Sequence, residues 1–242
     1  MHRSLLRSIL GIFAALMAVV LMAACSSSNP EVRQITLTLV RHAESTANAK
    51  GLINTKPPGP PLSAEGQKQA EALASKLKGG DYDGVYSSEL LRSEQTAEPA
   101  AKALDEKVEV LPGLNEISAG WYEDLPVDRS EATYLLPMNY WLTSNRKFTI
   151  PGSVNGNQFN AQFSDAVQHI YDSGNNKPIA FSSGNAIMMW VLLNVTNPKD
   201  SLRTDHPLPN TGRVVVTGNP VTGWTLKEWD GITDFSVGAT GD

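Results

Sequence analysis

The sequence of 242 residues contains a single cysteine, Cys25, and only four histidines. One cysteine excludes an intramolecular disulfide and a cysteine-rich zinc site. The few histidines limit any metal cluster, and no stretch is rich in aspartate or histidine, so we expect no catalytic metal and no cofactor. The net charge of −5 lacks the basic excess typical of nucleic-acid binding. We therefore expect no nucleic-acid partner.

Two familiar catalytic motifs are also missing. The loop at residues 152–156 lacks the Lys-Ser/Thr ending of a nucleotide phosphate loop. Residues 181–184 do not complete the Gly-x-Ser-x-Gly turn of the α/β-hydrolases, which lowers the esterase hypothesis without removing it. Hydrophobic residues make up 41% of the chain and charged residues 19%, a balance that supports a packed core rather than a disordered chain.

Residues 1–24 have the pattern of a signal peptide. Arg3 and Arg7 precede an uncharged run at residues 9–24, which is too short for a comfortable membrane span. The run ends in Leu-Met-Ala-Ala-Cys, which resembles a bacterial lipobox with Cys25 as the lipidated residue; an ordinary signal peptide is the alternative. We expect residues 25–33 to be the lipidated cysteine and a flexible tether. The lipid would anchor the protein, outside the cytoplasm, to the outer face of a bacterial cell membrane.

Strands that alternate with helices predict a single α/β domain at residues 34–242. The expected strands are 35–40, 83–87, 107–111, 178–182, 212–217 and 222–229, and the expected helices are 63–78, 89–104, 158–172 and 185–195. This alternation predicts three layers, with a mostly parallel sheet flanked by helices on both faces. Residues 112–157 are expected to form loops and short helices, whose aromatic residues either shape a pocket or cover the core: Trp121, Tyr122, Tyr140 and Trp141.

Arg41 and His42 directly follow the first expected strand, where open α/β sheets place their ligand sites. A neutral imidazole is a competent nucleophile at neutral pH, and a guanidinium binds phosphate in a bidentate manner. Phosphoryl transfer needs positioning and positive charge above all. An isolated Arg-His pair is more often a surface feature, so the assignment depends on the motifs that accompany it.

Five segments carry motifs at plausible spacing: Arg41–Ser45 with Asn48, Pro61–Ala70, Tyr86–Ala97, Leu114–Glu123 and Leu208–Gly212. Together they resemble the histidine phosphatase superfamily, the phosphoglycerate-mutase-like proteins, over about residues 35–230. Each motif is weak alone, and their common order makes the match specific. The resemblance implies a phosphoglycerate-mutase-like fold.

The resemblance also implies catalytic roles. His42 would accept the phosphoryl group as a phosphohistidine. Arg41 and Arg92 would clamp the phosphate oxygens. Glu116 would be the general acid for the leaving oxygen and then the base for water. Taken singly, Arg92 also fits an ion-paired helix residue and Glu116 a surface charge.

Two polar residues near the nucleophile have two equally good interpretations, as phosphate ligands or as structural caps. Ser45 and Asn48 either contact phosphate or cap the loop that contains them.

One position departs from the family pattern. The family carries a second histidine after its late strand, usually as Ser-His-Gly, which helps bind the phosphoryl group; Ser183 stands in that place. Loss of one such donor costs on the order of 10²–10³ in rate. Asn185 is a candidate to supply a further donor, and His206 is a candidate to reach the pocket from another direction. His169 is expected at the surface or in packing.

These features predict a slow, metal-independent phosphatase that acts on a small-molecule or protein-borne phosphomonoester. The alternative is a catalytically degenerate family member that binds a phosphorylated ligand or a partner protein without turnover. The sequence leaves the substrate and the oligomeric state open.

Overall fold

A computed structural model describes residues 32–143, 145–197 and 201–235 of the chain. The predicted signal peptide and Cys25, the predicted lipidation site, lie outside these residues, as does most of the predicted tether. From Gln34 onward the chain groups into one compact unit.

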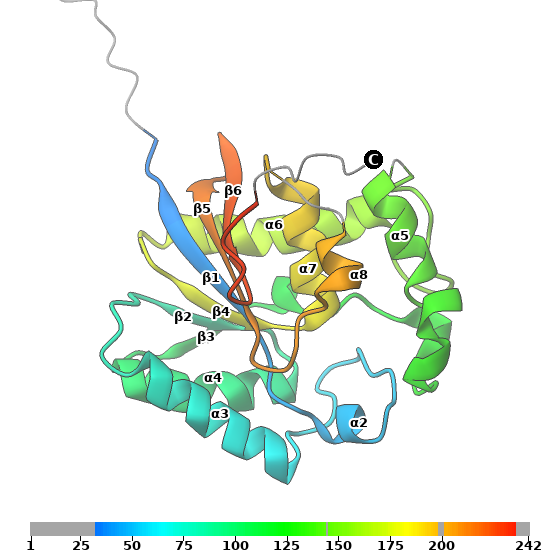
Figure 1. The fold of residues 1–242 in the computed structure, drawn as a ribbon, viewed down its shortest axis with the longest axis horizontal. Helices are drawn as coiled ribbons and strands as arrows, with labels where there is room; N and C mark the ends of the chain where they lie inside the picture. The colour runs from blue at the N-terminus through cyan, green and yellow to red at the C-terminus, as the bar shows by residue number, and fades with distance from the viewer. Residues whose placement is uncertain (1–31, 144, 198–200, 236–242) are drawn as a thin grey trace, which may run out of the picture. The chain divides into compact units, whose positions relative to one another are not determined.

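The strands of the described residues form one sheet in the order β3-β2-β4-β1-β5-β6 (Figure 1). Their bounds are β1 (Ile35–Arg41), β2 (Val85–Ser87), β3 (Val108–Val110), β4 (Ile179–Ser182), β5 (Arg213–Asn219) and β6 (Gly223–Trp229). The first four strands run parallel, whereas β5 is antiparallel to both β1 and β6. The prediction of a mostly parallel sheet is confirmed.

The helices follow local capping signals. Ser63 caps the first turn of the helix that follows it by accepting a hydrogen bond from the Gly66 N–H at 2.9 Å, and Asn155 forms a capping box with Gln158. The bounds are α2 (Thr46–Ala49), α3 (Ala64–Leu77), α4 (Leu91–Leu104), α5 (Leu136–Thr143), α6 (Gly156–Asp172), α7 (Gly184–Asn194) and α8 (Leu202–Asp205), with 3-10 turns η1 (Pro112–Leu114), η2 (Gly120–Tyr122) and η3 (Val127–Ala132). In the part of the chain that is described, no helix combines the length and apolarity needed to cross a bilayer.

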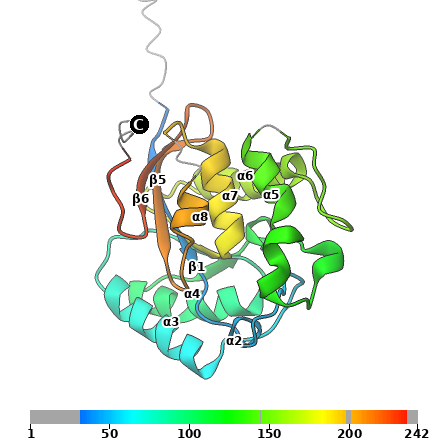
Figure 2. The ribbon, with the colours of Figure 1, turned by 45° about the vertical axis from the view of Figure 1, so that its right-hand side comes forward.

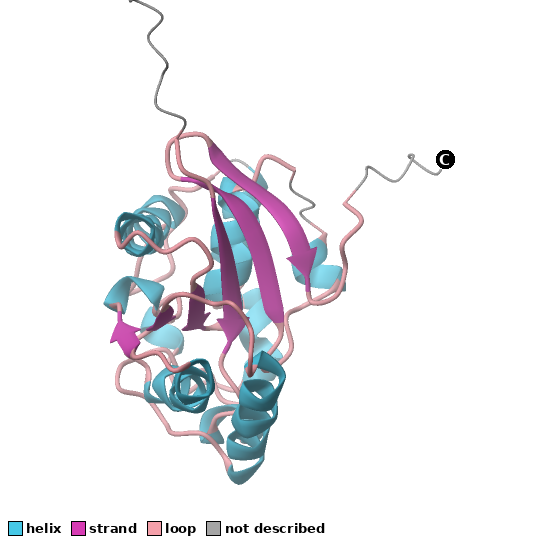
Figure 3. Cartoon of the chain, turned by 90° about the vertical axis from the view of Figure 1, so that its left-hand side faces the viewer, coloured by secondary structure: helices cyan, strands magenta, loops and turns pink. Residues whose placement is uncertain are grey.

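Helices cover both faces of the sheet, as Figures 2 and 3 show from different sides. Val40 and Phe181 pack toward α3 and α4. Ala97 and Ala100 of α4 are small, so this helix can lie close to the sheet. Leu37 and Leu39 face the larger core, which α5, α6 and α7 supply with side chains such as Phe163. Nearly all of α7 is buried, which explains why its sequence is apolar on every side. The predicted three-layer arrangement is confirmed.

The centre of the sheet positions the site. Strands β1 and β4 are neighbours, and their register pairs Arg41 with Ser182 at their carboxyl ends. The chain leaves β1 toward α3 on one face and leaves β4 into α7 on the other. The two connections diverge and open a crevice, the usual ligand site of open α/β sheets. The expected residues His42 and Ser183 therefore both follow strands at this point.

Candidate active site

A cavity of about 230 Å³ opens at the carboxyl ends of β1 and β4. Its lining includes six of the predicted site residues: Arg41, His42, Asn48, Arg92, Glu116 and Asn185. They come from positions between 41 and 185 in the chain, and the sheet topology brings them together.

The hydrogen bonds of His42 determine its tautomer. Its Nδ1 lies 2.7 Å from the Ala43 carbonyl oxygen, which only accepts, so Nδ1 carries the proton. Its Nε2 lies 2.8 Å from Nε of Arg92, which only donates, so Nε2 carries the lone pair. Burial, and then the charges of Arg92 and Arg41, hold the pKa of His42 well below its usual range. The imidazole is therefore neutral at neutral pH, with its nucleophilic nitrogen directed toward a cation.

The backbone around His42 is fixed from three sides. Its N–H donates to the Ser182 carbonyl at 2.8 Å, and its carbonyl accepts from the Asn210 amide at 3.0 Å. The next N–H, of Ala43, donates to Oγ1 of Thr96 at 3.0 Å. Thr96 in turn donates to the Arg92 carbonyl at 2.7 Å, which ties the nucleophile loop to α4.

Two guanidinium groups flank the imidazole. Arg92 is buried and donates through Nη2 to the Asn54 carbonyl at 3.0 Å. Arg41 donates through Nη1 to the Leu208 carbonyl at 2.6 Å, and its Nε is buried without an acceptor among the described residues. Burial lowers the pKa of both side chains, which shows how weakly their charge is solvated. Such a pair favours a dianion such as a phosphoryl group.

Glycine at position 184 makes room for Arg41. A Cβ atom there would lie 3.1 Å from Cδ and 3.3 Å from Nε of Arg41. The side chain of Arg41 thus lies directly against the start of α7.

Glu116 completes the charged residues of the cavity. Its Oε1 accepts from the N–H of Ile117 at 2.9 Å and from the N–H of Ala186, in the first turn of α7, at 3.0 Å. Burial raises the pKa of the carboxyl, while these hydrogen bonds and the two arginines oppose the rise. A carboxyl with a raised pKa retains its proton more readily, as a general acid must.

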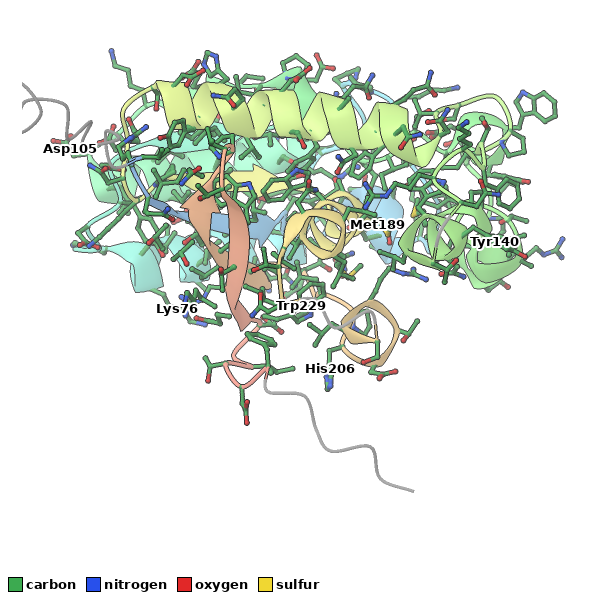
Figure 4. All side chains as sticks on the ribbon, turned by 90° about the horizontal axis from the view of Figure 1, so that it is seen from above. Lys76, Asp105, Tyr140, Met189, His206 and Trp229 are labelled. Carbon is green, nitrogen blue, oxygen red and sulfur yellow. The ribbon has the colours of Figure 1, made fainter. Side chains whose placement is uncertain are left out.

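Three candidate residues lie outside the cavity lining. Ser45 is buried, and its hydroxyl accepts the N–H of Asn48 within the cap of α2. Ser183 is buried, and its hydroxyl has no partner among the described residues. His206 is exposed and lies at the periphery in Figure 4. The structure therefore does not bring the His206 ring into the cavity lining, although the next two residues, Pro207 and Leu208, belong to that lining.

The cavity also contains residues that the sequence did not single out. Tyr134 is buried, donates to the Ile117 carbonyl at 2.6 Å and lines the cavity beside Asn185. Asn54 lines it too and accepts from Arg92. Both lie in loops or 3-10 turns without periodicity, so no sequence signal distinguished them. The aromatic residues that were candidates for shaping the pocket, Trp121, Tyr122, Tyr140 and Trp141, do not line this cavity.

Within the described residues, no three His, Cys, Asp or Glu side chains lie close enough together to bind a metal ion. The cavity instead offers two guanidinium groups, an imidazole and one carboxyl.

The chain belongs to the histidine phosphatase superfamily (branch 1), whose family model matches residues 37–231. The PE-PGRS family protein PE_PGRS11 of Mycobacterium tuberculosis is 45% identical over 219 residues, which cover 83% of this chain and 37% of that protein. The adenosylcobalamin/alpha-ribazole phosphatase of Escherichia coli is 39% identical over 87 residues, which cover 36% of this chain and 42% of that protein. The chain thus spans less than half of the length of these two relatives.

Solved structures share the fold. A mycobacterial glucosyl-3-phosphoglycerate phosphatase matches with a TM-score of 0.68 at 19% identity, covering 83% of this chain and 100% of that chain. A phosphoserine phosphatase of Entamoeba histolytica matches with a TM-score of 0.66 at 20% identity, covering 84% of this chain and 100% of that chain. At this identity the likeness extends to the fold alone.

The neutral state of buried His42 predicts a pH-dependent stability. Below about pH 6.5 the unfolded chain takes up a proton that the folded chain does not, so the free energy of unfolding falls as pH falls. We expect wild type to lose about 1.4 kcal/mol more than His42→Asn between pH 7.5 and 5.5, measured by urea unfolding. His169→Asn, at an exposed histidine, is the control that should follow wild type. Parallel curves for wild type and His42→Asn would contradict the assignment.

Proposed function

We propose that this protein hydrolyses phosphomonoesters, small or protein-borne, through a phosphohistidine at Nε2 of His42. The observation that carries the proposal is the fixed tautomer, with Nδ1 bonded to the Ala43 carbonyl and Nε2 free of a proton. The phosphatases among the relatives and fold neighbours support the same class of reaction.

The first step forms an N–P bond. Arg92 must transfer its hydrogen bond from Nε2 of His42 to a phosphate oxygen, which exposes the lone pair to phosphorus. Nε2 attacks as the bond from phosphorus to the ester oxygen breaks, and the leaving oxygen takes the proton of Glu116. Arg41, whose buried Nε lacks an acceptor, and Arg92 offset the charge on the phosphoryl oxygens.

The second step returns the enzyme to its starting state. Glu116, now a carboxylate, takes a proton from water, whose oxygen attacks phosphorus while the N–P bond breaks. The products are an alcohol and inorganic phosphate, and no metal or redox partner enters the balance. Nδ1 of His42 keeps its bond to Ala43 throughout, which stabilises the positively charged phosphohistidine ring.

Ser183 is the reason to expect slow turnover and to retain the alternative of a binding protein without turnover. Its neutral hydroxyl stands where the resemblance places a second histidine, and the cavity lining includes no side chain that replaces this charge. The presence of both a nucleophile and an acid favours catalysis, since a binding protein needs neither.

Phosphate release by residues 31–242 tests the mechanism. With a panel of phosphomonoesters and EDTA present, we expect turnover by wild type and none by His42→Ala, because no other group supplies the attacking lone pair. His169→Ala is the matched control. Acid-labile, base-stable phosphate on wild type, trapped by rapid quenching, should also be absent from His42→Ala. Equal turnover by wild type and His42→Ala would refute the mechanism.

The same assay separates the acid from the nucleophile. Glu116→Gln should lower kcat by about 10²–10⁴, with the greater loss for esters of poorly acidic alcohols. An equal loss for all esters would show that Glu116 only shapes the site.

Restoring a histidine at position 183 tests the cause of slow turnover. Ser183→His should raise kcat by up to about 10²–10³ if the missing charge limits the reaction. Ser183→Asn adds volume without charge and should give no gain. Phosphate binding by wild type without turnover, and no gain in Ser183→His, would favour the degenerate alternative.

We also propose that Cys25 is lipidated and anchors the domain outside the cytoplasm. The motif at residues 21–25 and the polar residues after it support this proposal. In a bacterial host, Cys25→Ser should move the protein from the membrane fraction to the soluble fraction or leave it unprocessed. Unchanged membrane association with normal processing would contradict lipidation.

A further inference from the structure

We propose that the cavity selects phosphomonoesters whose leaving group is apolar and carries no second negative charge. This inference rests on the proposed function, because it assigns the phosphoryl group to the arginines and His42. It concerns the rest of the cavity, where the leaving group must lie.

In the proposed mechanism, every charged side chain that lines the cavity already acts on the phosphoryl group or the ester oxygen. Among the described residues that line it, Arg41 and Arg92 are the basic side chains, and both face the phosphoryl position beside His42. Glu116 is the one acid. A carboxylate or a second phosphate on the leaving group would find no free cation there and would be repelled by Glu116 once it has lost its proton. Burial of such an unpaired charge is costly.

The uncharged part of the lining includes six large apolar side chains, which we call the apolar wall: Leu52, Ile53, Val127, Leu135, Met188 and Leu208. They come from the loop after α2, from η3, from the turn before α5, from α7 and from the loop before β5. The polar side chains that complete the lining are neutral, so they add no charge to pair with a second anion: Asn48, Asn54, Thr55, Ser130, Tyr134 and Asn185.

The segment that supplies Val127 to the cavity also carries exposed apolar side chains. Its volume of about 230 Å³ is below the roughly 300–1,000 Å³ of sites that enclose a drug-sized ligand, so a longer leaving group must extend outward. Of the eight exposed large apolar side chains in the described part of the chain, five lie between residues 121 and 140: Trp121, Leu125, Val127, Leu136 and Tyr140. Val127 both lines the cavity and is 46% exposed, so it is an apolar residue at the rim of the cavity.

A second cavity of about 520 Å³ is the alternative place where a charged leaving group could lie. It shares Thr55 and Glu116 with the first cavity and is lined by Lys56 and Asp165. Thr55 is buried; its N–H donates to the Glu123 carboxylate at 3.1 Å and its Oγ1 accepts the Ala119 N–H at 2.9 Å, so this shared residue is held in place. Lys56 is the basic residue among the described residues that line the second cavity, and it is exposed to solvent.

Matched substrates test the inference. For ethyl, butyl and hexyl phosphate, we expect kcat/KM to rise about fourfold for each added methylene that the apolar wall covers. Phenyl phosphate should be preferred at least tenfold over 4-carboxyphenyl phosphate, which differs by one carboxylate. A flat chain-length series, or a preference for the carboxylate, would overturn the inference while the phosphatase stands. A selective loss of activity toward 4-carboxyphenyl phosphate in Lys56→Ala, with phenyl phosphate unaffected, would also overturn it, by placing the leaving group beside Lys56 in the second cavity.

A positive charge introduced into the apolar wall should change the relative activity toward neutral and carboxylated esters. Val127→Lys should reduce the preference for phenyl over 4-carboxyphenyl phosphate at least tenfold and lower kcat/KM for hexyl phosphate. Val110→Lys is the matched control, because Val110 is similarly exposed, at 41%, but lies on the edge strand β3 away from the cavity. An identical change in both variants would contradict the role of the wall.

The affinities of non-hydrolysable analogues test the proposed selectivity independently of the proposed mechanism. The non-hydrolysable analogues ethylphosphonate, hexylphosphonate and 5-carboxypentylphosphonate can be titrated calorimetrically into wild type, with no need for turnover. Hexylphosphonate should bind most tightly and lose this advantage in Val127→Lys. If no ester is hydrolysed but this order holds, the phosphatase proposal fails and the selectivity stands. If the carboxylate analogue binds as tightly as hexylphosphonate, the selectivity fails.

Discussion

The hydrogen bond from Nδ1 of His42 to the carbonyl of Ala43 is the interaction on which the rest of the site depends. It makes one ring nitrogen a donor and leaves the other as the only one with a lone pair. Arg92 then holds this second nitrogen from the opposite side. A buried imidazole beside two guanidinium groups has its pKa held low, so the group is ready as a nucleophile without any base to remove a proton.

This arrangement has an electrostatic cost, because the positively charged side chains of Arg41 and Arg92 repel each other. Two partly desolvated cations lie close together, with Glu116 as the partly compensating charge. The surrounding hydrogen bonds to the carbonyl groups of Asn54 and Leu208 and the two apolar layers of the domain hold the arginines in place. A phosphoryl dianion completes the charge balance, which is why the structure favours this ligand over a neutral or cationic one.

The selectivity that we propose arises from a different part of the molecule than the proposed chemistry. The reacting groups follow the strand ends of the sheet and the start of α4, whereas much of the apolar wall comes from the segment between residues 121 and 140 and from α7. Loops tolerate change more readily than a buried sheet does. Two proteins that share this fold are named as phosphatases of different substrates, a phosphoserine phosphatase and a glucosyl-3-phosphoglycerate phosphatase.

The sequence by itself determined the layered α/β fold, and it singled out the residues that we propose for the reaction. Strand and helix periodicity is local, and Arg41, His42, Arg92 and Glu116 lie within ordered motifs that can be read without a structure. It also identified the departure at Ser183, although the closed environment of that hydroxyl depends on how α7 packs.

Only the tertiary structure decided the tautomer of His42, the surface position of His206 and the presence of Tyr134 in the cavity. These properties depend on contacts between residues far apart in the chain, and Tyr134 lies in a stretch without periodicity. The apolar wall has the same origin, because side chains from five separate segments form it only when the chain is folded.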